Sequence, residues 1–280
     1  MKRSLSKNFV IYSILVLVLL FFAFPIIYFV YISFLPAQDI YKIISFNFTL
    51  ENYVKLFTKG FLEESTYEIL YLPLINSLVI SLISGLVTLF VSLLAAYSIH
   101  GFKYKGRNGI SFFILTLYMV PPIVTFVPVW YLAQLLHLLD THILLIWCYS
   151  FFGIPLATWL LRSFLLTIPS EIEEAALVDG CTKVGAFMQV TFPLLKPGIA
   201  VALVLTFLVN WNEFLFASTL TSFNAITLPV ILGKFGLWLY IDWCSMAAIA
   251  TIALIPVIIL TLICQRYIIS GLTLGAVKGV

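Results

Sequence analysis

The chain has 280 residues, of which 62% are hydrophobic and only 10% are charged, and its mean hydropathy is +1.13. About a quarter of the residues of a soluble domain are charged, so this composition excludes a soluble globular fold and predicts an integral membrane protein. The formal net charge of +3 is too small to indicate a partner made of nucleic acid. The four cysteines, at positions 148, 181, 244 and 264, have no metal-binding spacing and are interpreted as small apolar residues.

The N-terminal third contains one long apolar run and one polar segment. Residues 1–8 are basic and residues 9–35 are apolar. The run is longer than the roughly 7 to 15 apolar residues of a signal peptide and lacks a small-residue cleavage site, which favours an uncleaved first transmembrane helix. Residues 36–73 are predicted to form an extracytoplasmic loop, with a short surface helix at Asn52-Tyr53.

Residues 74–269 contain five further predicted spans. A bilayer core requires roughly 20 apolar residues per helix, and the runs lie at about 74–99, 110–136, 143–166, 199–220 and 246–269. Pro121-Pro122 and Pro128 are expected to break the 110–136 run, and Pro197-Gly198 is interpreted as a break before the 199–220 run. The fold class is therefore all-α, with six transmembrane helices.

The distribution of basic residues predicts the orientation. With six spans both termini lie on one side, and if that side is inside, the positive-inside rule is satisfied by eleven inner against four outer basic residues. The inner residues are Lys2, Arg3, Lys7, Lys103, Lys105, Arg107, Arg162, Lys183, Lys196, Arg266 and Lys278, and the outer ones are Lys42, Lys55, Lys59 and Lys234. Residues 1–8 and the tail at 270–280 are therefore predicted to be cytoplasmic, as is the segment at 169–198.

The segment at 169–198 is polar and predicts two short helices with a bend between them. Ser170 and Glu173 have the spacing of a capping box, and Gly180 is placed to end the first helix with a left-handed cap. Thr182 is expected to cap the second helix, which is predicted to end before Phe192-Pro193. Such a helical elbow, apolar on one side and charged on the other, is shaped to fit a groove on another protein.

No catalytic or metal-binding residue is predicted. The sequence has no Gly-x-x-x-x-Gly-Lys-Ser/Thr phosphate loop, no nucleophile elbow and no His-Glu-x-x-His motif. His137, Asp140 and His142 lie close together in the short loop between the third and fourth spans. With no further histidine or cysteine nearby, a hydrogen-bonded loop is favoured over a metal site there.

Three segments resemble one known family. Glu174-Ala175-Ala176, followed by Gly180, Val190 and Phe192-Pro193, has the spacing of the EAA loop of ABC-importer permeases; Val190 replaces the usual Ile and Phe192 the usual Leu. Trp211-Asn212-Glu213-Phe214 and the ending Gly271-Leu272-Thr273-Leu274-Gly275-Ala276-Val277-Lys278-Gly279 resemble segments of sugar permeases. Over its whole length the chain is similar to carbohydrate ABC importer permeases, of the maltose type that lacks a large extracellular domain.

The resemblance implies a type I importer permease in the inner or plasma membrane of a bacterium or archaeon. The segment at 169–198 would be its cytoplasmic coupling helix, which docks on an ATPase through Glu174, Ala175, Ala176, Asp179, Gly180, Val190 and Pro193. Gly275 and Lys278 in the tail would also contact the ATPase. The implied partners are a second permease subunit, two copies of the ATPase, an extracellular sugar-binding protein, a sugar and membrane lipid. ATP and Mg²⁺ would be bound by the ATPase, so no cofactor is expected in this chain.

The role of Asn210, Trp211, Asn212 and Glu213 is left with two interpretations. At 1.5 Å per residue, Asn210 lies about 20 Å along the helix from Pro197, near or beyond mid-membrane. Polar groups at that depth face a cavity or a partner. These residues are expected either to contact the translocation path or the second permease, or to join helices of this chain.

Three alternatives for the function also remain. The cargo of an ABC permease is also compatible with a glycerol phosphodiester, an amino acid or a peptide. An intramembrane enzyme would use His137, Asp140, His142 or Glu213, but these form no evident acid–base pair. A secondary transporter would show inverted repeats and more intramembrane charges than this sequence contains.

Overall fold

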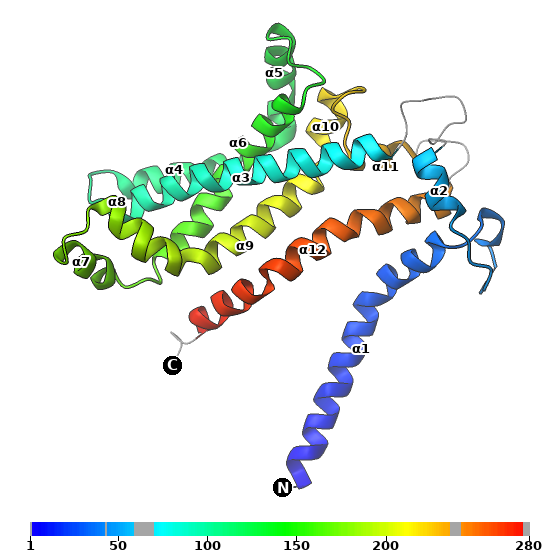
Figure 1. The fold of residues 1–280 in the computed structure, drawn as a ribbon, viewed down its shortest axis with the longest axis horizontal. Helices are drawn as coiled ribbons and strands as arrows, with labels where there is room; N and C mark the ends of the chain where they lie inside the picture. The colour runs from blue at the N-terminus through cyan, green and yellow to red at the C-terminus, as the bar shows by residue number, and fades with distance from the viewer. Residues whose placement is uncertain (1, 43, 59–69, 236–241, 277–280) are drawn as a thin grey trace. The chain divides into compact units, whose positions relative to one another are not determined.

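The computed structural model describes residues 2–42, 44–58, 70–235 and 242–276, which contain helices and no strand (Figure 1). The helices are α1 (Lys2–Ser33), η1 (Ala37–Asp39), α2 (Glu51–Thr58), α3 (Tyr71–Gly101), α4 (Arg107–Leu117), α5 (Pro122–Leu135), α6 (His142–Leu165), α7 (Ser170–Val178), α8 (Lys183–Ala186), the π-helix η2 (Phe187–Thr191), α9 (Phe192–Trp211), α10 (Leu215–Leu220), α11 (Leu228–Phe235) and α12 (Trp243–Ala276). The all-α prediction is confirmed.

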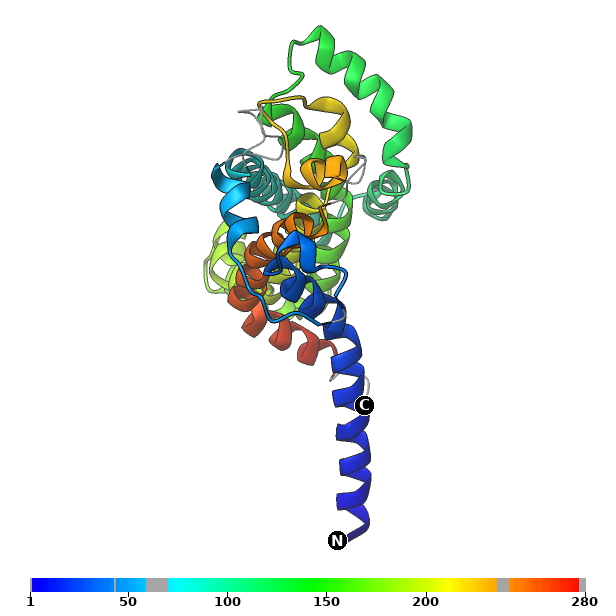
Figure 2. The ribbon, with the colours of Figure 1, turned by 90° about the vertical axis from the view of Figure 1, so that its right-hand side faces the viewer.

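Within the described residues, five helices are long and apolar enough to cross a membrane, and a sixth span results if α4 and α5 are counted together. These two helices meet at 85° (Figure 2). Pro122 begins α5, where its fixed φ and missing N–H are tolerated, so the break predicted at Pro121-Pro122 is present. Pro128 lies inside α5 and does not end it, so the break predicted there is wrong.

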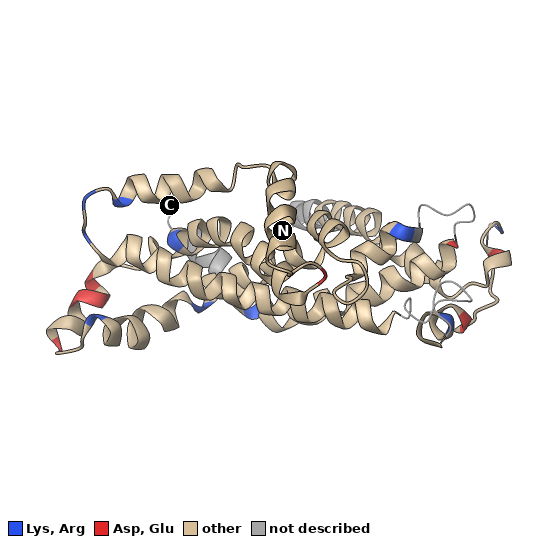
Figure 3. Ribbon diagram, turned by 90° about the horizontal axis from the view of Figure 1, so that it is seen from above, with Lys and Arg blue, Asp and Glu red and all other residues tan. Residues whose placement is uncertain are grey.

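Charged side chains lie mostly near the ends of the long helices, and the ribbon between them is almost free of them (Figure 3). This pattern is expected of helices that cross a bilayer, because a charge in the hydrocarbon core is costly. The last helix, α12, continues past the predicted end of the sixth span at residue 269 and reaches Ala276.

The chain forms two compact units, and the smaller one comprises residues 1–71 and 232–255. The end of α1 packs there on the start of α12 through Ile32, Leu35, Cys244 and Ala247. The expected helix at Asn52-Tyr53 is α2, but Asn52 is buried rather than on the surface. Its amide nitrogen donates to the carbonyl oxygens of Ser33 and Leu35, both at 2.8 Å, because carbonyls at the C-terminal end of a helix and just after it need donors.

Asp39 organises the loop that follows α1 in this unit. Its carboxylate pairs with Lys42 at 2.6 Å and accepts hydrogen bonds from Ser45 at 2.6 Å and Asn47 at 3.0 Å. These contacts, led by the one with Lys42, lower the pKa of Asp39 to about 2. Burial alone would raise this pKa, so the contacts with Lys42, Ser45 and Asn47 are what keep Asp39 an anion that holds the loop.

The larger unit, residues 72–231 and 256–280, is built on α3, α6 and α9. Its core contains Leu89 and Ala96 of α3, Leu161 and Leu165 of α6, and Leu195 and Ala202 of α9. Small polar side chains on α3 and α6 allow these two helices to approach closely. Ser92 of α3 donates to the carbonyl of Ile154 at 3.1 Å, and Ser150 of α6 donates to that of Ser84 at 3.3 Å.

Candidate functional site

At one end of the larger unit, α7 and α8 form a helical elbow, residues 170–186 (Figure 1). Gly180 ends α7 with φ of 92°, a conformation that costs a residue with a Cβ atom free energy. The N–H of Gly180 donates to Leu177 O at 3.1 Å, and that of Cys181 to Ala176 O at 3.0 Å. These two bonds satisfy carbonyls at the helix end, so the predicted left-handed cap is confirmed.

The capping box predicted at Ser170 is wrong. Ser170 is the first residue of α7 and Pro169 is its N-cap, which makes no side-chain capping bond. Glu173 turns away from the helix end, and its Oε1 accepts from the Tyr97 hydroxyl at 2.7 Å while its Oε2 accepts from the Thr191 hydroxyl at 2.8 Å. The Glu173 carboxylate therefore accepts hydrogen bonds from two hydroxyl groups of other elements, and not from a backbone N–H at the start of its own helix.

The second helix of the elbow begins as predicted but does not end as predicted. Thr182 Oγ1 accepts from the N–H of Gly185 at 3.1 Å and caps α8. The π turn η2 then joins α8 to α9, so the helix runs continuously from Lys183 to Trp211. The expected end before Phe192-Pro193 and the expected break at Pro197-Gly198 are both wrong. Pro193 falls in the first turn of α9, beside a π turn in which the backbone bonding already shifts.

The outer face of the elbow exposes apolar side chains. Val178 is 87% exposed, Val184 71% and Met188, which follows in η2, 58%. Of the predicted coupling residues, Glu174, Ala175, Asp179, Gly180 and Pro193 are exposed, Val190 is half-buried, and Ala176 is buried beneath the elbow. Exposed apolar side chains on a polar loop outside the membrane-spanning helices are available for contact with another protein.

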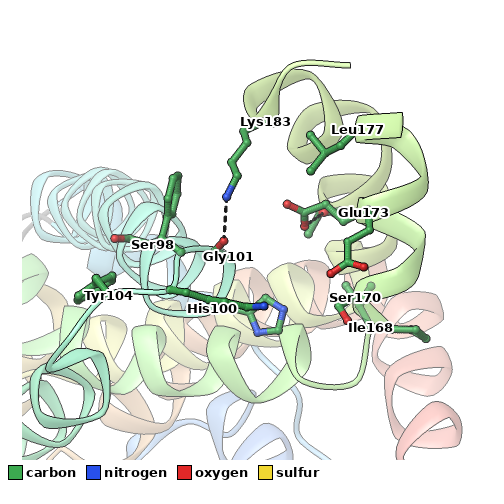
Figure 4. A pocket seen from close by; sticks show the side chains of 14 residues that line it. Ser98, His100, Gly101, Tyr104, Ile168, Ser170, Glu173, Leu177 and Lys183 are labelled. Atoms are coloured by element: carbon green, nitrogen blue, oxygen red, sulfur yellow. Dashed lines mark hydrogen bonds between the residues drawn. The ribbon is translucent and has the colours of Figure 1, made fainter. Parts of the chain in front are cut away.

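A pocket of about 780 Å³ separates the end of α3 from α7 (Figure 4). Lys183 reaches across it to donate to the carbonyl of Gly101 at 3.2 Å, and its ammonium group lies 4.4 Å from the centre of the Phe102 ring. Glu173 faces the pocket from α7 and His100 from the α3 side. The end of α3 and the elbow therefore lie at the same end of the unit.

At the opposite end, the loop before α6 holds the turn that follows α10. The carboxylate of Asp140 accepts hydrogen bonds from the N–H groups of Ser222, Phe223, Asn224 and Ala225 at 3.0 to 3.3 Å. Burial by itself raises the pKa of Asp140, but the four backbone donors outweigh burial and hold it below its ordinary value.

The histidines of this loop make different contacts. His142 Nε2 lies 2.8 Å from Asn76 Oδ1, and the amide nitrogen of Asn76 donates to the carbonyls of Asn224 and Ile226, both at 2.9 Å. His137 has a left-handed backbone, with φ of 54°. In the described part of the chain, no three His, Cys, Asp or Glu side chains are placed to hold a metal ion together.

The segment that begins at Asn210 joins helices of this chain. Asn210 is buried and donates to Ser84 Oγ on α3 at 2.7 Å, and Trp211 is buried against Phe207. The carboxylate of Glu213 accepts the N–H groups of Phe216 and Ala217 at 2.9 and 3.2 Å and so caps α10. The contacts of Asn210 and Glu213 lie within this chain, which agrees with the second interpretation for these two residues. Asn212 is exposed.

The span predicted at 199–220 is therefore wrong in its extent. Two helices, α9 and α10, occupy it and are separated at residues 212–214. In the tail, Gly275 lies in the last turns of α12, and Lys278 lies outside the described residues.

Comparison with known proteins assigns the family. Residues 88–273 match the family model described as binding-protein-dependent transport system inner membrane component. The chain belongs to this family. Its members are transport components of the inner membrane rather than enzymes, which excludes the intramembrane enzyme, and the several apolar helices agree with a multi-pass membrane protein.

Curated relatives match the permease over nearly its full length. The inner membrane ABC transporter permease protein YcjP of Escherichia coli is 35% identical over 99% of both chains. The trehalose/maltose transport system permease protein MalG of Thermococcus litoralis is 31% identical over 100% of both. A bacterial ABC transporter that imports alginate has the same fold, with a TM-score of 0.74 at 21% identity over 96% of this chain and 98% of that one.

The sequence did not reveal Tyr97 as a partner of the permease's elbow. Tyr97 lies near the end of α3, 76 positions before its partner Glu173. The sequence shows only that a residue with a hydroxyl group lies in the last turns of an apolar span. It does not indicate which residue that hydroxyl group contacts. Thr191 lies inside the loop that carries the motif, yet its burial on the inner side emerges only in the folded chain.

Proposed function

We propose that the chain is one of two permease subunits of an ATP-driven importer and passes a sugar or oligosaccharide delivered by an extracytoplasmic binding protein. The cargo is supported by relatives named for sugars: the trehalose/maltose permease above, and the arabinooligosaccharides permease AraQ of Bacillus subtilis, 34% identical over 85% of this chain. A solved alginate transporter with the same fold is described in complex with a pentasaccharide-bound periplasmic protein.

The elbow is the proposed contact with a cytoplasmic ATPase. The observation that carries this assignment is the exposure of the apolar side chains of Val178, Val184 and Met188 in this polar segment of the chain. The exposed residues Glu174 and Asp179 would flank the contact and provide charges for it. The rest of the coupling set would be Ala175, Ala176, Gly180, Val190 and Pro193, with Gly275 and Lys278 as a second contact in the tail.

The proposed orientation places the elbow and both termini in the cytoplasm. Lys103, Lys105 and Arg107 follow the end of α3, and this end lies beside the elbow that carries Lys183. Basic residues from two separate loops therefore gather at one end of the larger unit, as the positive-inside rule requires of a cytoplasmic face.

In the proposed mechanism, the ATPase subunits bind ATP and the permease subunits change conformation. Two ATPase copies would bind ATP and Mg²⁺, because this chain contains no phosphate-binding loop. Their closure would favour one of two packed states of the permease pair, and the elbow would carry the difference in free energy between these states to the helices. The permease needs no covalent chemistry for this role.

The contact is tested by disulfide cross-linking in membranes that contain the whole complex. Because Ala176 is buried, the sharper position is Val178→Cys in a chain whose partly exposed Cys181 is replaced by Ala. Single cysteines are scanned across the surface of the ATPase, and Phe223→Cys at the opposite end of the unit is the matched control. We expect cross-links from position 178 that change with ATP and none from position 223. An ATPase that co-purifies without cross-linking at 178 would contradict the proposed contact.

The cargo is tested separately, with the complex and its binding protein in vesicles. Uptake of labelled sugars and oligosaccharides is compared with uptake of glycerol phosphodiesters, amino acids and peptides. ATP-dependent uptake restricted to one of the last three classes would replace the sugar assignment and leave the ATPase contact intact.

A further inference from the structure

Glu173 connects the elbow to two elements of the helix core at once. Its Oε1 accepts from Tyr97 on α3 at 2.7 Å, and its Oε2 accepts from Thr191 at 2.8 Å. Thr191 is the last residue of the π turn that leads directly into α9. One carboxylate on α7 therefore contacts both α3 and the beginning of α9.

The elbow has few other connections to α3. The two are separated by the pocket of about 780 Å³, and α7 itself packs on α8 and η2 (Figure 4). In the described part of the chain, the hydrogen bond between α7 and α3 is the one from Tyr97 to Glu173. Two further hydrogen bonds link α3 to α8, and both are exposed to solvent. Lys183 donates to the carbonyl of Gly101 at 3.2 Å, and the Tyr97 hydroxyl lies at the 3.5 Å limit from the carbonyl of Lys183.

The two donors are held firmly. Thr191 is only 2% exposed. The ring of Tyr97 lies 4.3 Å from that of Phe187 and 6.1 Å from that of Phe102, measured between centroids. These contacts restrict both hydroxyl groups, and hydrogen bonds to a carboxylate are stronger when it is ionised than those between neutral groups. A displacement of the elbow must therefore break these bonds or move α3 and α9 with it.

The other glutamates of α7 differ from Glu173. Glu171 and Glu174 are exposed, and neither accepts a hydrogen bond within the described residues. All three carboxylates lie near the N-terminus of one helix, and Glu174 also lines the pocket, but among the three only Glu173 accepts hydrogen bonds from other elements within the described residues. Its role therefore differs from that of a surface contact with a partner.

We propose that Glu173 is a positioning residue: through Tyr97 and Thr191 it makes the elbow move together with α3 and α9. This inference rests on the proposed function, in which the elbow receives the movement of the ATPase. Without this interaction, the amount of sugar imported for each ATP hydrolysed would fall. Docking of the ATPase would not require it, because the exposed side chains of the elbow stay unchanged.

The test uses the complete complex in vesicles, with ATP hydrolysis and sugar uptake measured on the same sample. Glu173→Ala and Tyr97→Phe each remove the bond between α7 and α3. Glu173→Ala also removes the bond to Thr191, Tyr97→Phe also removes the long bond to the Lys183 carbonyl, and Glu173→Gln retains a hydrogen-bonding oxygen. Glu171→Ala is the matched control on the same helix. Tyr104→Phe is the control for Tyr97→Phe, because Tyr104 lines the same pocket and its hydroxyl has no hydrogen-bond partner in the described residues.

We expect Glu173→Ala and Tyr97→Phe to lower the amount of sugar imported per ATP by about 5-fold or more, with Glu173→Gln in between and both controls unchanged. A role in stability alone would lower uptake and hydrolysis in proportion. If Glu173→Ala does not assemble, Tyr97→Phe decides the question. An unchanged ratio of uptake to hydrolysis in Tyr97→Phe, or an equal loss in Tyr104→Phe, overturns this inference alone. Lack of ATP-driven uptake by the unmodified complex overturns the proposed function and the inference with it.

Discussion

Gly198 lies at the closest approach between α9 and α6, and Gly198→Ala is expected to destabilise the protein. A Cβ atom at this position would lie 2.6 Å from Cγ, 2.8 Å from Cβ and 2.9 Å from Cδ2 of Phe164. Carbon atoms pack at about 3.5 to 4.0 Å, so the backbones of the two helices must separate by roughly 1 Å. The Cβ atom of Phe164 is fixed by the backbone, so a change of rotamer cannot relieve the contact at 2.8 Å.

The size of the effect follows from two opposing contributions. Overpacking of a core costs about 1 to 3 kcal/mol, whereas replacing Gly by Ala inside a helix gains up to about 1 kcal/mol. The clash prevails, and we expect Gly198→Ala to lower the free energy of unfolding by about 1 to 2 kcal/mol. Gly109→Ala in α4 is the matched control, because a Cβ atom added there would meet no atom within 4 Å and only the gain applies.

Unfolding of the purified protein in detergent with increasing denaturing surfactant measures both variants. In a chain that also carries Phe164→Ala, the cost of Gly198→Ala should fall, since two of the three close atoms are removed. If Gly198→Ala is as stable as Gly109→Ala, the close approach of α6 and α9 at this position is refuted.

Three further predictions concern polar contacts. Asn210→Ala should lower the free energy of unfolding by about 1 kcal/mol, with a coupling of roughly 0.6 kcal/mol to Ser84→Ala in a double-mutant cycle; purely additive costs would contradict the contact. Asp140→Asn should accelerate amide hydrogen exchange in the turn after α10 and leave the elbow, an internal control, unchanged; slow exchange in that turn would show that another group anchors it. The stabilisation by Asp39 should be complete above its ordinary pKa of 3.8 and be lost as the pH falls through about 2. A carbon-13 NMR titration of its carboxyl group measures this, and a midpoint near 3.8 would refute the role of its hydrogen bonds.

The course of the long helices was predictable because the bilayer imposes their length and composition. Apolar runs located α1, α3, α6 and α12 to within a few residues at most ends, and Pro121-Pro122 located the bend between α4 and α5. Other prolines misled the prediction. Pro128 and Pro197 lie inside helices, and helices that cross a membrane tolerate prolines because local adjustments and neighbouring groups satisfy the freed backbone carbonyls.

At the elbow, the predictable features were those that depend on the backbone within a few residues. Gly180 and Thr182 determine the bend and the cap by their own conformation and side chain, so their positions in the sequence sufficed. Glu173 had the right spacing for a capping box. The neighbouring backbone N–H, however, competes for this carboxylate with every other donor that folding brings close to it. Tyr97, 76 residues away, provided a better one.

The sequence by itself thus determined the membrane-spanning architecture, the family and the location of the elbow, since each depends on composition or on short-range spacing. Only the tertiary structure decided which side of the elbow faces outward, that Glu173 joins α7 to α3 and η2, and that Asn210 and Asp140 bind partners 126 and more than 80 residues away. The physical reason is that a polar side chain is satisfied by whichever donor or acceptor packing places within about 3 Å, and packing is a property of the whole fold.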